Sequence, residues 1–162
     1  MNRSRMKIAL VVTVAGLLLA GTPAFSGSSS DNDSDSVRVA PVSSKVVQAE
    51  CGACHMAYPP RFLPAASWRA IMAGLEDHFG EDATLDDKLK QGIERFLVDH
   101  ASRRKAGKNP PLRITELRWW RGEHGRMNRY LKRLSKRYGR KIKMSECTVC
   151  HRAAERGNYD DD

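Results

Sequence analysis

Two short motifs hold every cysteine of the chain, and each places a histidine directly behind its second cysteine. The first is CGACH at residues 51–55, and the second is CTVCH at residues 147–151. Positions i, i+3 and i+4 share one face of a helical turn, so each motif presents two thiols and one imidazole to the same side. This spacing is the sequence signature of haem c attachment, in which the cysteines form thioethers and the histidine reaches the iron. The predicted attachment residues are Cys51, Cys54, Cys147 and Cys150, and the predicted proximal ligands are His55 and His151.

Three other interpretations of the cysteine pairs compete with haem attachment. A thioredoxin-like dithiol also uses CxxC, but it requires a βαβ setting that the sequence does not indicate. A structural zinc site with four cysteines would join pairs that lie 93 positions apart, from residue 54 to residue 147, far wider than in compact zinc modules. Plain disulfides are the third alternative, in an oxidising compartment. None of the three requires a histidine after each pair, so we predict two covalently bound haem c groups, each with its iron.

Each iron needs a ligand on its other face, and the chain has three further histidines. Two of them, His78 and His124, lie on the predicted apolar faces of helices, and we expect them to be the distal ligands. His100 lies at the polar end of a predicted helix. A cationic side chain is favourable near a helix C-terminus, so the position of His100 is explained without iron ligation. Two histidines give a saturated, low-spin iron suited to electron transfer, whereas an open position would allow oxygen or peroxide chemistry. Pairing His55 with His78 and His151 with His124 closes the shorter loops, and we prefer it for that reason. The crossed pairing stays open.

The hydrophobic pattern predicts an all-α fold. Apolar residues recur at helical spacing in a segment capped by Ser67 and ended by Gly80, and in a second one from Thr84 to about residues 102–107. The Pro110–Pro111 break separates these from a third helix capped by Thr115, a fourth over residues 127–138 and a short last one after Ser145. No alternating run indicates a strand. The apolar faces are few, so the core is expected to need a cofactor to fill space.

The ends of the chain indicate export. Residues 1–26 have a basic head, an apolar run over residues 8–20 and small residues that allow cleavage after Ala24 or Ser26, as in a secretory signal peptide. The run is shorter than the roughly 20 residues of a membrane span, so we expect no stable membrane insertion after cleavage, and a periplasmic location. The predicted regions after the signal are a disordered polar linker at 27–46, two haem-binding halves at 47–108 and 109–156, and an acidic tail at 157–162.

The segment 101–143 is strongly basic. It contains sixteen Lys and Arg against two Glu, a net charge of +14. Export argues against a nucleic-acid partner, which such a stretch would suggest in a cytoplasmic protein. A solvated helix face and a site for anionic lipid headgroups are two interpretations. The functional one is a docking region for an acidic redox protein of the periplasm, steered by charge.

With these motifs and histidines, the chain resembles the family of small periplasmic dihaem cytochromes c that serve as electron donors. The likeness covers about residues 48–151 and rests on both CxxCH motifs and on His124. It also rests on the short sequences YPP, LP, SW and IM within residues 58–72, HFG at residues 78–80, and IT and WW within residues 114–120. It implies two bis-histidine haems in two small halves, with His55 and His151 proximal and His78 and His124 distal. It also implies electron carriage, without catalysis, to a partner such as an oxygen-binding monohaem cytochrome c. The alternative is a haem enzyme or a gas or redox sensor in which one axial position is open or displaceable.

Overall fold

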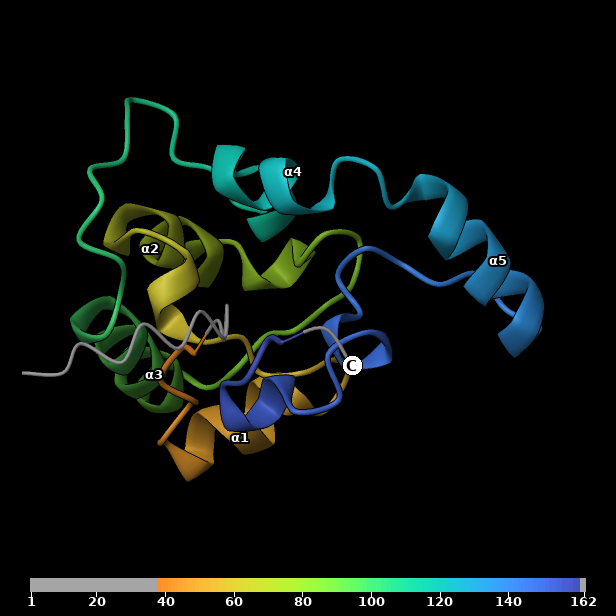
Figure 1. Ribbon diagram of the computed structural model, residues 1–162. Helices are drawn as coiled ribbons and strands as arrows, with labels where there is room; N and C mark the ends of the chain where they lie inside the picture. The colour runs from red at the N-terminus through yellow and green to blue at the C-terminus, as the bar shows by residue number, and fades with distance from the viewer. Residues whose placement is uncertain (1–37, 161–162) are drawn as a thin grey trace, which may run out of the picture. The chain divides into compact units, whose positions relative to one another are not determined.

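The computed structural model describes residues 38–160. Within that range the chain forms five α-helices joined by short 3₁₀ turns (Figure 1). The helices are α1 (Lys45–Gly52), α2 (Ala65–Ala73), α3 (Asp87–Asp99), α4 (Arg118–His124) and α5 (Asn128–Tyr138). The 3₁₀ turns are η1 (Pro60–Phe62), η2 (Leu75–Asp77), η3 (Ile114–Glu116), η4 (Cys147–Val149) and η5 (Ala154–Arg156). Extended pairing among the described residues is limited to isolated bridges, so the predicted all-α class is confirmed.

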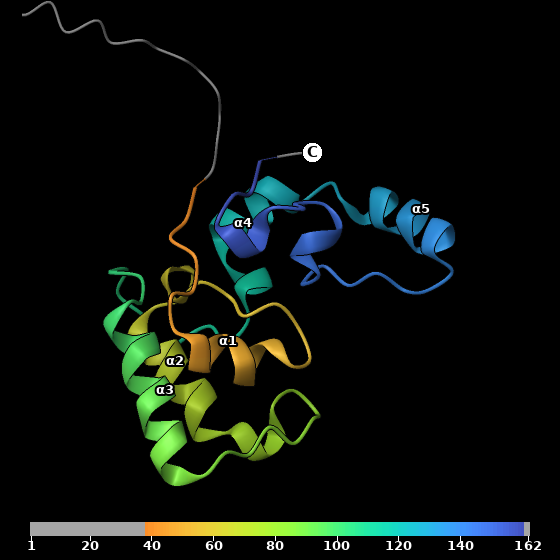
Figure 2. The ribbon, with the colours of Figure 1, turned by 90° about the horizontal axis from the view of Figure 1, so that it is seen from below.

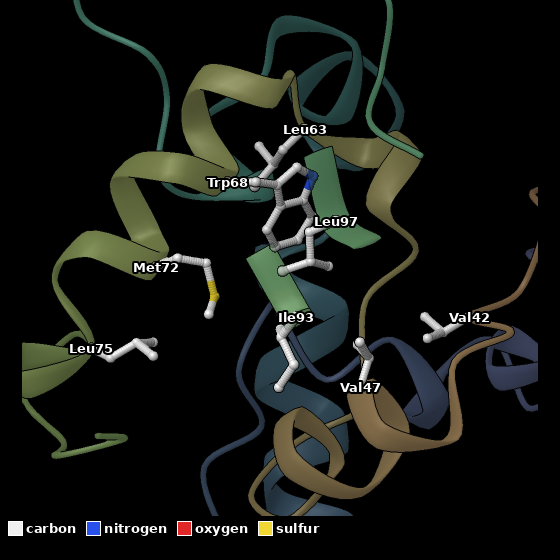
Figure 3. Close-up of a cluster of buried hydrophobic side chains, with 8 residues drawn as sticks. All are labelled: Val42, Val47, Leu63, Trp68, Met72, Leu75, Ile93 and Leu97. Atoms are coloured by element: carbon white, nitrogen blue, oxygen red, sulfur yellow. The ribbon is translucent and has the colours of Figure 1, made fainter. Parts of the chain in front are cut away.

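The main core lies where α2 packs beside α3 (Figures 1 and 2). Asp86 starts α3 by accepting a hydrogen bond from the backbone N–H of Leu89 at 3.0 Å. The helix then buries Ile93 and Leu97, four positions apart on one face. Figure 3 shows these side chains among the rest of one apolar cluster, which consists of Val42, Val47, Leu63, Trp68, Met72, Leu75, Ile93 and Leu97. All of it comes from residues 42–97.

The second half of the described chain buries much less. Its buried apolar residues are Trp120, Leu134, Ile142 and Ala154. Helix α5 ends at Gly139, which has the left-handed conformation (φ 65°) that glycine adopts at low cost. A half with so few buried side chains gains little from the hydrophobic effect alone, in agreement with the predicted need for a cofactor that fills space.

Three of the expected helix starts are wrong. Ser67 is not an N-cap: the helix begins after Pro64, and Ser67 lies inside it, fully buried. The second predicted helix, observed as α3, begins after Asp86 rather than at Thr84, and it ends at Asp99, earlier than expected. Thr115 lies within η3, and α4 begins only after Leu117. The segment at residues 127–138 forms α5 as expected, whereas the last predicted helix is only the 3₁₀ turn η4.

The two ends of the described range lie against each other. The backbone N–H of Val39 donates to the carbonyl of Gly157 at 2.8 Å, and a Cβ on Gly157 would collide with the carbonyl oxygen of Val39. Gly157 also has φ 79°, so glycine is required there twice over. Residues 38–46, assigned from sequence to the polar linker, include the buried Val42 and the start of α1 at Lys45.

Several sequence predictions lie outside the described residues. These are the signal peptide at 1–26, the linker up to residue 37 and the last two residues of the acidic tail. Among residues 38–160, no helix has both the length and the apolar character that crossing a membrane requires.

Candidate functional site

The first motif begins on α1 and continues in the turn that follows it. Ser44 starts α1 by accepting a hydrogen bond from the N–H of Val47 at 3.3 Å, and Val47 anchors the helix in the core. Cys51 lies in the last turn, half-buried, while Cys54 and His55 are exposed beyond it. Burial, and then the nearby Glu50 carboxylate, raise the pKa of Cys51. Cys51 is therefore a neutral thiol at neutral pH.

His78 lies opposite His55. It follows η2 in a turn in which its backbone N–H donates to the Glu81 carbonyl at 2.7 Å, so it is not on the helix where the sequence pattern put it. The next residue, Phe79, has φ 60° and packs its ring 4.9 Å from that of His78. The ring centroids of His55 and His78 are 6.2 Å apart, with 21° between the ring planes. Burial, followed by His55 and Arg113, lowers the pKa of His78, so this ring is neutral at neutral pH.

The second motif is built on a 3₁₀ turn. Cys147 opens η4, Cys150 caps it, and the backbone N–H of His151 donates to the Cys147 carbonyl at 2.8 Å. This hydrogen bond closes the loop between Cys147 and the histidine. Burial, and to a smaller degree the neighbouring Cys150, raise the pKa of the Cys147 thiol to about 11.

His124 is the last residue of α4, and the structure brings it to His151. Trp120, one turn earlier, stacks on His124 with ring centroids 4.3 Å apart and planes 6° apart, which fixes the orientation of the imidazole. The ring centroids of His124 and His151 are 6.1 Å apart, with planes at 80°. The pairing preferred from the sequence, His55 with His78 and His151 with His124, is therefore the one in which the ring centroids lie close together.

Both ring separations fit one iron between two imidazoles. An imidazole nitrogen binds a metal at about 2 Å, and the centre of a five-membered ring lies about 1.1 Å behind its atoms, so trans ligands have centroids roughly 6.2 Å apart. The two pairs, at 6.2 and 6.1 Å, match this value. The angle between the planes is unconstrained by ligation, because each ring can turn about its own metal–nitrogen bond.

Hydrogen bonds at Nδ1 set the tautomer of three of the four histidines. Nδ1 lies 2.8 Å from the Met56 carbonyl in His55, 3.0 Å from the Trp120 carbonyl in His124 and 3.1 Å from the Asp160 carbonyl in His151. A carbonyl only accepts, so each Nδ1 carries the proton, and the lone pair of the neutral ring is then on Nε2, the nitrogen that would bind a metal. Within residues 38–160 the ring of His78 has no such hydrogen bond, and Phe79 is its ring neighbour.

The remaining histidine, His100, and the core methionine Met72 lie away from the two histidine pairs. His100 caps α3, is exposed and uses Nδ1 on the Phe96 carbonyl at 2.8 Å, with its ring stacked on Phe96 at 4.4 Å. The described residues place no second histidine ring beside it. Met72 is buried in the main core as a packing residue. No group of three or more His, Cys, Asp or Glu among the described residues is arranged to hold a metal ion by itself.

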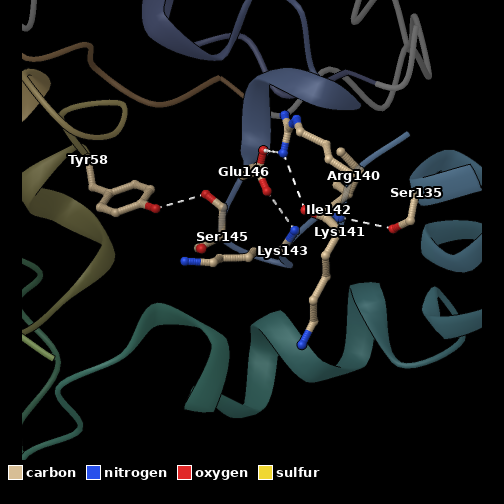
Figure 4. Close-up of polar contacts among 8 residues, drawn as sticks. All are labelled: Tyr58, Ser135, Arg140, Lys141, Ile142, Lys143, Ser145 and Glu146. Atoms are coloured by element: carbon tan, nitrogen blue, oxygen red, sulfur yellow. Dashed lines mark hydrogen bonds and ion pairs between the residues drawn. The ribbon is translucent and has the colours of Figure 1, made fainter. Parts of the chain in front are cut away.

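Aromatic residues connect the two motifs, and sequence reasoning gave them no role. The Tyr58 ring lies 4.9 Å from that of His55, and its hydroxyl donates to the Ser145 carbonyl at 2.8 Å (Figure 4). The ring of Tyr159 lies 5.8 Å from that of His151 and 5.2 Å from that of Phe62. An aromatic residue three positions behind the first CxxCH histidine is the one sequence signal that could have drawn attention to Tyr58.

The segment between α5 and the second motif is held by polar contacts, also shown in Figure 4. Glu146 forms an ion pair with Arg140 at 2.7 Å and accepts a hydrogen bond from the Lys143 backbone N–H at 2.6 Å. Burial opposes ionisation of Glu146, but these contacts outweigh it and lower its pKa. The Ser135 hydroxyl of α5 accepts from the Ile142 N–H at 2.9 Å, so the helix and the loop are tied together ahead of Cys147.

A helical fold with two CxxCH motifs and two pairs of neighbouring imidazoles is typical of a c-type cytochrome. Comparison with known proteins supports this class. The family model for dihaem cytochrome c matches residues 47–159. A crystal structure of DHC purified from Rhodobacter sphaeroides is 42% identical, with a TM-score of 0.62 over 73% of this chain and 98% of its own. A second structure, of the diheme cytochrome c from the same organism, is 38% identical, with a TM-score of 0.65 over 74% and 99%. The diheme cytochrome type c of Shewanella baltica OS155 is 39% identical, with a TM-score of 0.60 over 72% and 86%.

A search of curated proteins gives no match. The family match spans most of the chain, and the chain therefore belongs to the dihaem cytochrome c family. Membership means that it carries two haem c groups and acts in electron transport, as predicted from the paired motifs.

Proposed function

We propose that this chain is a periplasmic electron carrier whose two haems are each ligated by two histidines. His55 and His78 would bind one iron, and His151 and His124 the other. The observation that carries the proposal is the pair of ring separations, 6.2 and 6.1 Å, each of which fits one iron between the rings.

The four cysteines would anchor the haems. Each thiol would form a thioether with a vinyl group of the haem and so tie the haem covalently to the chain. A bound haem supplies an iron that gains or loses one electron.

The protein residues around each iron serve to keep the coordination fixed. Trp120 holds the His124 ring against rotation, and carbonyls fix the tautomers of His55, His124 and His151. A centre with two imidazoles in place offers no site for a substrate, so catalysis is not expected of it. A haem enzyme or gas sensor is the second candidate, and the observation in its favour is that the His78 ring has only Phe79 and His55 as described ring partners.

Export and the partner are further parts of the proposal. The basic, apolar and small-residue order of residues 1–26 supports cleavage and transfer to the periplasm. The basic segment 101–143 supports docking of an acidic redox protein, such as an oxygen-binding monohaem cytochrome c, and neither nucleic acid nor membrane insertion is part of the proposal.

Expression with the natural N-terminus in a host that attaches haem c tests the proposal. We expect the mature protein to begin after Ala24 or Ser26 and to carry the mass of two haems, while Cys51→Ala with Cys54→Ala removes one. The reduced protein should not bind carbon monoxide at neutral pH. Stoichiometric binding of carbon monoxide would instead favour the sensor or enzyme.

A further inference from the structure

Charge is divided unequally along the described chain. Residues 47–100 carry five Lys and Arg against nine Asp and Glu, a net charge of −4. Residues 101–160 carry eighteen against five, a net charge of +13. The first CxxCH motif and His78 belong to the acidic part, and His124 and the second motif belong to the basic part. An anionic partner is therefore repelled by one part of the chain and attracted by the other.

Helix α5 concentrates the positive charge on one face. Its basic residues recur at i, i+3, i+4, i+7 and i+8, all exposed, and they are Arg129, Lys132, Arg133, Lys136 and Arg137. The opposite face turns Leu134 inward, at 8% exposure. The ion pair found within residues 38–160 joins Arg140 to Glu146, so none of these five cations is neutralised by a described carboxylate. The face is thus fully available to an external anion.

This helix is also bracketed by the second histidine pair. It begins at Asn128, four residues after His124, and the loop that leaves its C-terminus runs directly to Cys147. Ser135 and Glu146 fasten that loop through the hydrogen bonds to Ile142 and Lys143. A molecule bound to the basic face of α5 would therefore contact the helix that connects the elements carrying His124 and His151 in the chain.

We propose that an acidic redox protein docks on the basic face of α5, and that electrons cross the interface through the second haem rather than the first. This inference rests on the proposed electron-carrier function and adds to it the docking element and the haem that makes the exchange. The acidic part of the chain contributes specificity, because an anionic partner that approached the first haem would meet net negative charge.

The test compares two holoprotein variants that lose the same three charges. The first replaces Lys132, Arg133 and Lys136 of α5 by Gln. The matched control replaces Lys88, Lys90 and Arg95 of α3 by Gln. The rate at which hexacyanoferrate(III), a trianion, oxidises each reduced protein is measured by stopped flow at low and high salt. We expect the α5 variant to be slower by about tenfold at low salt, the control by less than about twofold, and all rates to converge at high salt.

Equal slowing of both variants would mean that the rate depends on net charge and not on the position of the charges. A wild-type rate that does not change with salt would mean that charge does not steer the anion to the protein. Either result overturns the inference. Hexacyanochromate(III), a redox-inert paramagnetic trianion, locates the docking face by NMR. Broadening is expected on α5 and around His124 and His151, and broadening centred on α3 or on the His78 turn would overturn the proposal.

Two further measurements separate the remaining outcomes. Sedimentation of wild type, but not the α5 variant, with phosphatidylglycerol vesicles at physiological salt would assign the face to a membrane surface and overturn the protein partner. Electron paramagnetic resonance of both variants must show two low-spin haems. If it does, failure of the docking inference leaves the proposed function intact, and if wild type does not, the proposed function itself has failed.

Discussion

Tyr58 offers a sensitive test of how the two motifs are held together. Its hydroxyl joins the turn behind the first motif to the Ser145 carbonyl, 87 positions later and two residues before Cys147. Tyr58→Phe removes this 2.8 Å hydrogen bond and keeps the ring beside His55. A neutral hydrogen bond contributes about 1 kcal/mol, and the exposed Ser145 carbonyl can turn to water instead, so we expect a loss of about 1 kcal/mol at most. For a domain of this size that corresponds to a Tm lower by about 4 °C.

Tyr159→Phe is the matched control. Tyr159 belongs to the same aromatic cluster, but its buried hydroxyl has no hydrogen-bond partner within residues 38–160. Its removal should leave stability unchanged or slightly higher. Guanidinium unfolding of the holoproteins, followed by far-UV circular dichroism, measures both. Equal destabilisation by the two substitutions, or none by Tyr58→Phe, would refute the assignment of a linking hydrogen bond to Tyr58.

Three other substitutions test the ligands and the loop before the second motif. Replacement of His78 or His124 by Met should raise one of the two reduction potentials by on the order of 0.1 V or more and leave both haems attached. This change lies within the span of about 0.8 V that axial ligands cover. Unchanged potentials in a redox titration would count against the replaced histidine as a ligand. His100→Gln should leave the low-spin optical spectrum as it is, and a changed spectrum would reassign a ligand. Glu146→Gln removes the charge that pairs with Arg140, and we expect a loss of about 0.5–1 kcal/mol in denaturant unfolding at neutral pH. Because the folded state lowers the pKa of Glu146, this contribution is present above the ordinary pKa of a glutamate and fades as the pH falls, so the two proteins should converge in acid.

Periodicity in the sequence predicted the long helices better than the short ones. Helices α3 and α5 both carry apolar residues at helical spacing, and both were expected. Helix α1 was missed because it has only eight residues and buries only Val47, although the Ser44 cap was a readable signal. Ser67 was mistaken for a cap because its side chain suits one. Pro64 precedes the helix instead, and tertiary packing buries Ser67 inside it.

The site was predictable in its chemistry and less so in its geometry. The CxxCH motifs named the cofactor because no other use of the cysteines needs the histidine. The placement of His124 on the same helix face as Trp120 could be predicted from their spacing of one turn. His78 was expected on a helix, but it lies in a turn shaped by Phe79 and Glu81. The contacts of Tyr58 and Tyr159 join residues far apart in sequence, and local patterns carry no information about such distances.

Electron paramagnetic resonance of the oxidised, mature holoprotein tests the central claim most directly, because it counts the haems and reports both ligand pairs together. Ring planes 21° apart at His55 and His78 predict a rhombic low-spin signal, and planes 80° apart at His124 and His151 predict a second, strongly anisotropic one, in equal amounts. A high-spin ferric signal, or a single low-spin signal that integrates to one haem, would contradict the assignment of four histidines to two irons.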